Sequence, residues 1–359
     1  MINYKHNQFF KNEVAKLRIA SAEDSIWAFA RRYLPDDFNL PPSTMHKEMA
    51  ELFKNASQSR CKRIAIAGPR LYKQSELACL VYVLWSICFG KEAFILLVGD
   101  TLQQACEQLT IIKDNLETNP YLLQDFPEAT GKNTKSWQAK YFTSRNGVKV
   151  QATGLTQEPQ VFIYKGKRPS LIIFDTMQEY LPHEENRFMS DMEYLENILK
   201  HSCSTETNVI VVGTIMHRLS ILLKLFRLKP DWIGKRYQAI ISEALNQPLW
   251  GQWQAIFNNE MDYEGNKGPQ SAEVFFNNNK DAMLEGAKAL WPEYENYHKL
   301  MEIKLSMMDN ERFNCEKQNS PKDPFAAKRE RMREALFALE RQLAEEEKQA
   351  KSEIPQPSS

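Results

Sequence analysis

Short runs of consecutive apolar residues recur along the first 245 residues of the chain, separated by polar stretches with helical periodicity. Apolar runs of four to six residues without alternation are typical of strands buried on both faces, and intervening helices indicate parallel βαβ units. The strands predicted in this way cover residues 63–67, 94–99, 148–153, 171–175, 208–213 and 237–241. We therefore expect an α/β domain with a doubly wound, mostly parallel sheet over about residues 41–245.

Helical patterns fill the intervals between these runs. The apolar run over residues 77–90 is too short to cross a bilayer and predicts a buried helix. Thr101 can cap a helix that reaches residue 116, and further helices are predicted around residues 189–200 and 219–226. Near the start of the chain, an apolar stripe with a spacing of three to four residues predicts a helix, and it consists of Ile26, Phe29, Ala30 and Tyr33.

Breaks in these patterns divide the chain into four predicted parts. They are an N-terminal helical extension (1–40), the α/β domain (41–250), an irregular and helical exit region (251–320) and a charged C-terminal helix with a tail (321–359). The stretch 258–280 is rich in Asn and Gly, which predicts a loop. In the last part, Met332, Leu336, Leu339 and Leu343 mark one face of a solvated helix or a short coiled-coil seam.

Charge is balanced, with 46 basic and 46 acidic residues among 359. This balance argues against broad coating of nucleic acid, so any DNA contact has to come from a local cluster such as Lys165, Lys167 and Arg168. The six cysteines form no CxxC pair and are expected to be free thiols rather than zinc ligands. A polar N-terminus excludes a secretory signal, and the prediction is a cytoplasmic protein without a membrane partner.

Ligands of parallel α/β domains bind at the carboxyl ends of the strands, so the loop after residue 67 is the first candidate site. It reads GPRLYKQSE, from Gly68 to Glu76. A phosphate-binding loop needs G-x-x-x-x-G-K-[ST], in which backbone amides and a lysine hold the phosphates and a hydroxyl holds magnesium. Gly68 and Ser75 are in register, whereas Lys73 takes the place of the second glycine and Gln74 that of the lysine. By itself this is a poor match.

Two later strand ends strengthen the nucleotide-site hypothesis. Asp175 ends the run LIIFD, where P-loop enzymes keep the acidic residue that holds magnesium through water, and Thr214 ends the run NVIVVGT. This order is typical of P-loop motor ATPases and helicases. We expect Ser75, Asp175 and Thr214 to converge at the carboxyl edge of the sheet.

Over roughly residues 25–325 the chain resembles the large terminase subunits of tailed phages. PPSTMHKEMAELF (41–53) resembles their adenine-side segment, GPR-x4-SE is similar to their phosphate loop APRGHGKST, and VYVLWSICFGKE (81–92) is similar to AYVLW-ICYGKE. RPSLIIFDTMQ resembles RPDLIILDDLE, VVGTIMH resembles the coupling motif VVGTILH, and LWPE with FNCEKQN resembles the exit from the ATPase domain.

The resemblance implies a P-loop NTPase fold of the terminase type (an ASCE-like sheet), with a helical C-terminal extension, and a role in packaging double-stranded DNA. It implies ATP and Mg²⁺ as cofactors, with a portal, a small terminase subunit and further copies of the chain as partners. The implied catalytic residues are Asp175, Gln178 and Thr214, and the implied metal ligands are Ser75 and Asp175. The implied nucleotide-binding residues are Gly68, Pro69, Arg70, Lys73, Gln74, Ser75 and His46.

The departures from the family fall where the chemistry would be. The family's Gly-His-Gly-Lys-Ser-Thr corresponds to residues 71–76, LYKQSE, which leaves Lys73 as the nearby candidate to replace the missing positive charge. Its Asp-Asp-x-Glu corresponds to residues 175–178, where the amide of Gln178 cannot accept a proton from water. Gln160 and Val161 stand in place of an Arg-Gly pair.

Three functions therefore stay open. The first is a terminase ATPase domain with degenerate phosphate-loop and strand-end motifs and weak or no hydrolysis. The second is an active packaging ATPase that works with a separate nuclease subunit, and the third is a helicase-like P-loop regulator. The family's nuclease half would need a further domain of roughly 100–200 residues, so DNA cutting is not expected.

Overall fold

A seven-stranded sheet organises the first of the two compact units, Met1–Pro321 and Lys322–Ser359, in this computed structural model. The structure describes residues 2–132, 136–155, 157, 161–176, 185–228, 230–307, 309–322, 331–333, 335–337 and 341. The strand order is β3-β4-β2-β5-β6-β1-β7. The strands are β1 (Arg63–Ala67), β2 (Phe94–Gly99), β3 (Tyr141–Thr143), β4 (Lys149–Gly154), β5 (Leu171–Thr176), β6 (Asn208–Gly213) and β7 (Ile233–Arg236).

All strand pairs in this sheet are parallel except β3 with β4. The register aligns Ala67 of β1 with Gly213 of β6, and Gly213 with Thr176 of β5. Strand β6 thus lies between β1 and β5, which brings the ends of these three strands to one edge. The predicted parallel strands and the doubly wound sheet are confirmed.

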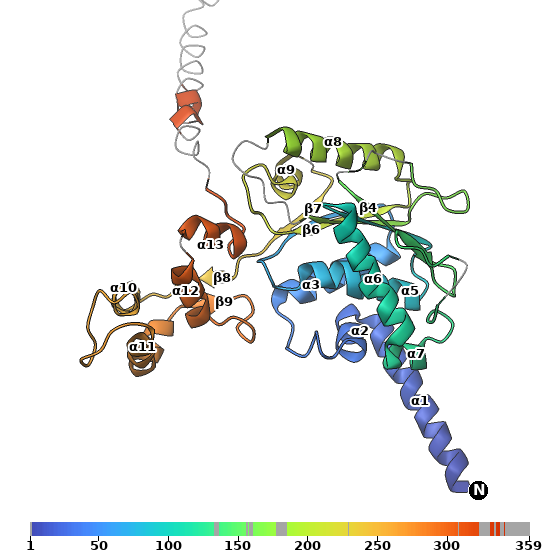
Figure 1. Cartoon of the computed structure of the whole chain (residues 1–359), viewed down its shortest axis with the longest axis horizontal. Coiled ribbons are helices and arrows are strands. Elements are labelled where there is room, and N and C mark those ends of the chain that lie inside the picture. Colours follow the sequence, from blue (N-terminus) through green and yellow to red (C-terminus); the bar gives the residue numbers. More distant parts are fainter. Residues whose placement is uncertain are drawn as a thin grey trace, which may run out of the picture. The chain divides into compact units, whose positions relative to one another are not determined.

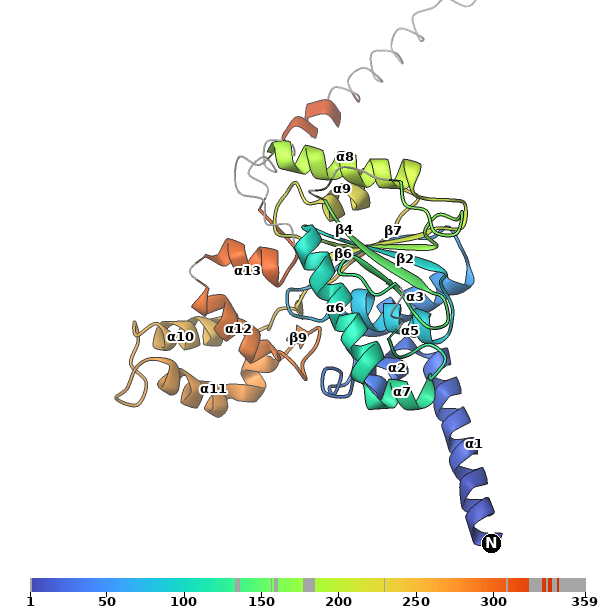
Figure 2. The same ribbon diagram turned by 45° about the vertical axis from the view of Figure 1, so that its right-hand side comes forward.

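Helices cover both faces of the sheet (Figures 1 and 2). Alternate residues of each central strand enter different cores. On β6, for example, Ile210 packs in the core formed with α2, α3, α5 and α6, and Val211 packs in the core formed with α8 and α9. Burial on both faces explains the continuous apolar runs of these strands. The helices of this part are α1 (Ile2–Asp24), α2 (Ile26–Tyr33), α3 (Thr44–Gln58), α4 (Gln74–Glu76), the π-helical turn η1 (Leu77–Val81), α5 (Tyr82–Cys88), α6 (Leu102–Thr118), α7 (Pro120–Asp125), α8 (Glu185–His201) and α9 (Ile221–Leu228).

The predicted cap and stripe are both present. The Oγ1 atom of Thr101 accepts a hydrogen bond from the backbone N–H of Gln104 at 3.2 Å and so begins α6. Every residue of the predicted α2 stripe is buried.

The predicted strand 237–241 is displaced, because only its last two residues, 240 and 241, lie in a strand. The chain pairs earlier, in β7, and later, in β8 (Ile240–Ser242), which is antiparallel to β9 (Lys288–Ala289). Strand β7 lies at the sheet edge and reads IGKR, so no apolar run marks it. Gly234 is needed there, because a Cβ atom would lie 2.9 Å from the Phe226 ring.

The loop predicted over residues 258–280 is also wrong from residue 269 onward. Helix α11 (Pro269–Leu284) begins with proline in its first turn and packs against α10 (Gln247–Phe257), with Phe275, Phe276 and Met283 buried. Helices α12 (Tyr297–Ser306) and α13 (Asn310–Glu316) follow.

In the second unit, the described residues 331–333, 335–337 and 341 are helical. Met332 and Leu336 are exposed, whereas Leu339 and Leu343 of the predicted seam lie outside the described residues. Among the described helices of the whole chain, none has the length and apolar character needed to span a bilayer.

Candidate functional site

Ser75, Asp175 and Thr214 meet at the carboxyl edge of the sheet. The Ser75 hydroxyl, at the start of the helix after β1, donates a hydrogen bond to Oδ1 of Asp175 near the end of β5 at 2.6 Å. The Thr214 hydroxyl, just after β6, donates to the carbonyl oxygen of Gly68 at 2.9 Å. The sheet order explains this convergence, because β6 separates β1 from β5.

The loop between β1 and α4 keeps the backbone shape of a glycine-rich loop. Leu71 has φ 71° and Lys73 has φ 60°, both in the left-handed region that favours glycine. These are the two positions at which the terminase loop has glycine. The backbone conformation is therefore retained although both residues carry side chains.

Gln74 stands where the family has its lysine, and its side chain is buried. Its Nε2 atom donates to Thr214 Oγ1 at 3.2 Å and lies 3.3 Å from the carbonyl oxygen of Gly68. The neutral amide thus joins the loop to the end of β6. It supplies no positive charge for a phosphate group.

Lys73 points away from this position. Its Nζ atom donates to the backbone carbonyl of Asp37 and lies 5.1 Å from the centre of the Phe38 ring. The expectation that Lys73 replaces the missing charge is not met in this conformation. A cavity next to Lys73 is lined by further aromatic side chains, those of Trp27, Trp291 and Tyr294.

The His46 side chain contacts the backbone of the loop. Its Nδ1 atom accepts from the backbone N–H of Ser43 at 3.1 Å, and Nε2 donates to the carbonyl oxygen of Tyr72 at 2.7 Å. Burial lowers the pKa of His46 to about 4, so the ring is neutral at neutral pH. Because both ring nitrogens bond to the protein, His46 acts here as a cap of α3 and a prop for the loop.

Asp175 is buried, and burial raises its pKa to about 6, helped by the nearby Glu76 carboxylate and opposed by the Ser75 hydroxyl. A divalent cation would offset this cost of ionisation. Ser75 Oγ and Asp175 Oδ1 are the oxygen ligands that Mg²⁺ prefers. The residues present therefore fit the metal ion.

The loop is also fastened to α13. The backbone N–H of Arg70 donates to the carbonyl oxygen of Glu316 at 2.7 Å, and the Arg70 guanidinium pairs with the Glu316 carboxylate at 3.1 Å. Lys317 Nζ donates to the Arg70 carbonyl at 3.2 Å and to both carboxylate oxygens of the buried Glu295 at 2.8 and 2.9 Å. Nothing in the sequence indicated that these three residues contact the loop, although Glu316 and Lys317 lie in FNCEKQN and Glu295 lies two residues after LWPE.

The remaining predicted residues lie elsewhere. Pro69 lies in the loop and accepts a backbone hydrogen bond from Tyr72 at 3.1 Å. Gln178 and Gln160 lie outside the described residues. Lys165 and Lys167 are exposed on a turn whose Tyr164 ring lies 6.0 Å from that of Phe94, the first residue of β2. That turn is therefore at the amino edge of the sheet, opposite Ser75, and Arg168 beside it is half-buried.

No protein-family model and no curated protein sequence matches the chain. Similar solved structures include the large terminase of a thermophilic bacteriophage, at 13% identity and TM-score 0.38 over 55% of this chain and 46% of that one. A variant of the Thermus phage P74-26 large terminase ATPase domain has 12% identity and TM-score 0.41, over 80% of this chain and 97% of that one. The HK97 bacteriophage large terminase has 12% identity and TM-score 0.41, over 74% and 54%.

All three of these solved structures are large terminases. The fold of this chain is an α/β domain with a mostly parallel, seven-stranded sheet. The chain spans about half the length of the first of these terminases.

Proposed function

We propose that this chain is the ATPase-type domain of a phage large terminase that keeps the fold and loop shape but hydrolyses ATP weakly or not at all. The observation that carries the proposal is the position of Gln74. Its buried amide bonds to Thr214 at the point where a lysine would hold the β- and γ-phosphates. In phosphoryl transfer, loss of that charge weakens both nucleotide binding and stabilisation of the transition state.

Ser75 and Asp175 would hold Mg²⁺ if nucleotide binds, and the ion would then neutralise phosphate charge. The cavity lined by Trp27, Phe38, Trp291 and Tyr294 beside Lys73 offers aromatic surfaces to a nucleobase. Under this proposal the partners are double-stranded DNA, a portal, a small terminase subunit and other copies of the chain, in the cytoplasm of a bacterial host.

The test is to restore the loop by changing Lys73→Gly and Gln74→Lys together, with Glu76→Thr and Gln178→Glu added in a second variant. Calorimetry with Mg-ATP and a phosphate-release assay compare these variants with the unchanged chain. We expect turnover near background in the unchanged chain and ATP binding at least about 10-fold tighter in the restored variants, since one charge-assisted contact contributes about 1.5–3 kcal/mol.

Gln103→Lys serves as the matched control, because it adds the same charge on an exposed face of α6. It should leave ATP binding unchanged. Rapid hydrolysis by the unchanged chain, abolished by Asp175→Ala, would contradict the proposal and favour an active packaging ATPase with a separate nuclease. Hydrolysis that requires single-stranded nucleic acid would favour a helicase-like regulator.

A further inference from the structure

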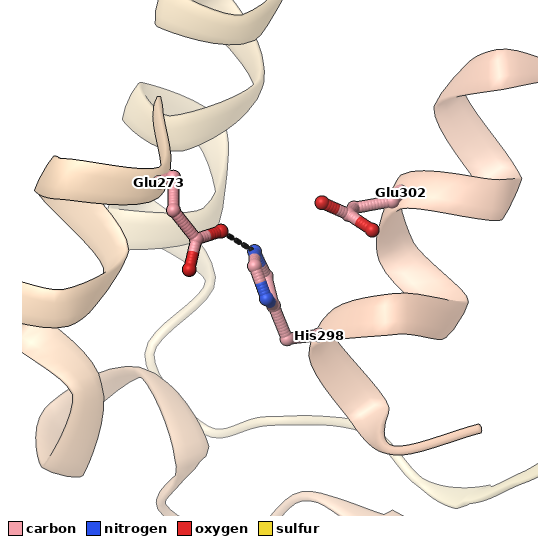
Figure 3. A group of neighbouring side chains, drawn as sticks. All are labelled: Glu273, His298 and Glu302. Atoms are coloured by element: carbon pink, nitrogen blue, oxygen red, sulfur yellow. Dashed lines mark ion pairs between the residues drawn. The ribbon is translucent and has the colours of Figure 1, made fainter. Parts of the chain in front are cut away.

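Helices α11 and α12 bring together three side chains of types that can bind a metal ion (Figure 3). Glu273 comes from α11, and His298 and Glu302 come from α12. The two α12 residues are four positions apart and so lie on one face of the helix. One ligand atom of each residue lies within 4.8 Å of the others.

The His298 ring is fixed in place by aromatic neighbours. It stacks on Phe276 with the ring centres 3.8 Å apart and an angle of 4° between the planes, and Trp253 lies edge-on at 5.4 Å. Only 12% of the His298 side chain is exposed. The ring can therefore turn little, and its Nε2 atom faces Glu273 (Figure 3).

The Nε2 atom of His298 is buried and has no hydrogen-bond partner among the described residues. Its distance to Oε2 of Glu273 is 3.7 Å, which is too long for a hydrogen bond. Buried polar atoms are almost always hydrogen-bonded, so this ring nitrogen, whose ion-pair partner among the described residues is the Glu273 carboxylate at 3.7 Å, has room to accept a ligand.

Carboxylates and ammonium groups both lie near His298. The carboxylates are those of Glu273 and Glu302, and the ammonium groups are those of Lys280 and Lys299. Glu302 also accepts a hydrogen bond from Lys299 at 3.0 Å, so this lysine competes with a cation for one carboxylate.

We propose that Glu273, His298 and Glu302 bind one Zn²⁺ ion that links α11 to α12. One imidazole nitrogen and two carboxylate oxygens are a donor set that zinc accepts, with water in the fourth position. Two negative charges balance the dication. The imidazole disfavours Mg²⁺ and Ca²⁺, which prefer oxygen ligands alone. The proposal does not depend on the function of the phosphate loop.

The test uses the full chain freed of metal with a chelator, then titrated with Zn²⁺ against a chromophoric competitor. We expect one equivalent to bind and the thermal midpoint to rise. Glu273→Gln and Glu302→Gln should each weaken binding by at least about 10-fold, the lower end of the loss seen when outer-shell partners of metal ligands are removed. His298→Ala should abolish binding, and Co²⁺ should give visible absorption with the unchanged chain but not with His298→Ala.

His201→Ala is the control, since His201 is an exposed histidine at the end of α8. It should bind zinc like the unchanged chain. His298→Ala also removes the stacking on Phe276, so the two Glu→Gln variants decide the question if that protein folds poorly. The proposal would be overturned if both Glu→Gln variants bound zinc as tightly as the unchanged chain does. It would also be overturned if the unchanged chain did not bind zinc.

Discussion

At the scale of single residues, the ionisation of Asp175 makes the stability of the folded protein depend on pH. The pKa of Asp175 is raised to about 6 by burial, from an ordinary value of 3.8. The folded state therefore binds the proton more tightly than the unfolded state. The contribution of Asp175 to stability is fully present below pH 3.8 and is lost as the pH rises through 6, a change of about 3 kcal/mol in all.

Asp175→Asn removes this titration while keeping an oxygen that accepts from Ser75. We expect the unfolding free energy of the variant, relative to the unchanged chain, to increase by about 1 kcal/mol between pH 5 and pH 7.5. Urea unfolding at several pH values measures it. His46, whose pKa is lowered to about 4, changes stability in the opposite direction but is common to both proteins and cancels in the difference.

Asp281→Asn, on an exposed part of α11, is the control and is unfolded under the same conditions. The same pH dependence in both variants would contradict the role given to burial. Added Mg²⁺ should stabilise the unchanged chain more than Asp175→Asn, because the ion favours the ionised carboxylate.

Leu71 offers a test of strain in the loop. It has φ 71° and is 65% exposed, so a change to glycine removes strain and little packing. We expect Leu71→Gly to raise the unfolding free energy by about 0.5–1 kcal/mol, after allowing for the greater freedom of glycine in the unfolded chain. Glu76→Gly, within α4, should lower it by about 1 kcal/mol. Destabilisation by Leu71→Gly would show that the loop is not strained.

At the scale of elements, Lys317, just after α13, pairs with Glu295 before α12 and also donates to the loop carbonyl of Arg70. Both side chains of the pair are buried. Lys317→Met leaves the Glu295 carboxylate buried without its partner, and we expect a loss of about 3–5 kcal/mol in unfolding free energy. Chemical denaturation measures it.

The matching double variant, Lys317→Met with Glu295→Leu, replaces the pair by apolar groups of similar size. It should recover most of the lost stability, because a buried ion pair and an apolar pair are often similar in free energy. If the double variant were as unstable as the single one, packing rather than charge would explain the effect.

Comparing the elements shows what the sequence could predict. Strands β1, β2, β5 and β6 were found because burial on both faces leaves continuous apolar runs, and their order brought Ser75, Asp175 and Thr214 together. Strand β7 was missed because an edge strand needs few apolar residues. Helix α11 was not predicted because the three asparagines Asn277–Asn279 are typical of a loop. They directly follow Phe275 and Phe276, which are buried in the helix.

The side-chain directions within the site could not be predicted. Lys73 turns toward Asp37 and Phe38, which are 36 and 35 residues earlier in the chain. Gln74 bonds to Thr214, which is 140 residues later. Such contacts depend on how distant segments pack, and spacing along the chain does not encode them.

At the scale of the whole molecule, zero net charge makes any DNA contact local. The exposed turn with Lys165 and Lys167 is the predicted contact, beside Lys149, whose ammonium lies 5.4 Å from the centre of the Tyr164 ring. We expect Lys165→Ala with Lys167→Ala to weaken double-stranded DNA binding and to reduce the slope of log K against log salt by about 2. Fluorescence anisotropy at several salt concentrations measures both quantities.

Lys132→Ala with Lys267→Ala removes the same charge from other exposed positions and should change neither quantity. Binding that is insensitive to salt would exclude phosphate contacts as its basis.

The left-handed backbone at Leu71 and Lys73 also has an evolutionary consequence. A loop with left-handed backbone at two residues that are not glycine is held in shape by contacts with its surroundings. His46 contacts Tyr72, and Glu316 and Lys317 contact Arg70. Lineages carrying this scaffold can exchange the side chains of the loop without rebuilding the backbone. Under the proposed function, the loss of nucleotide-binding residues would be a reversible step, open to recovery through a few point substitutions as long as these contacts remain.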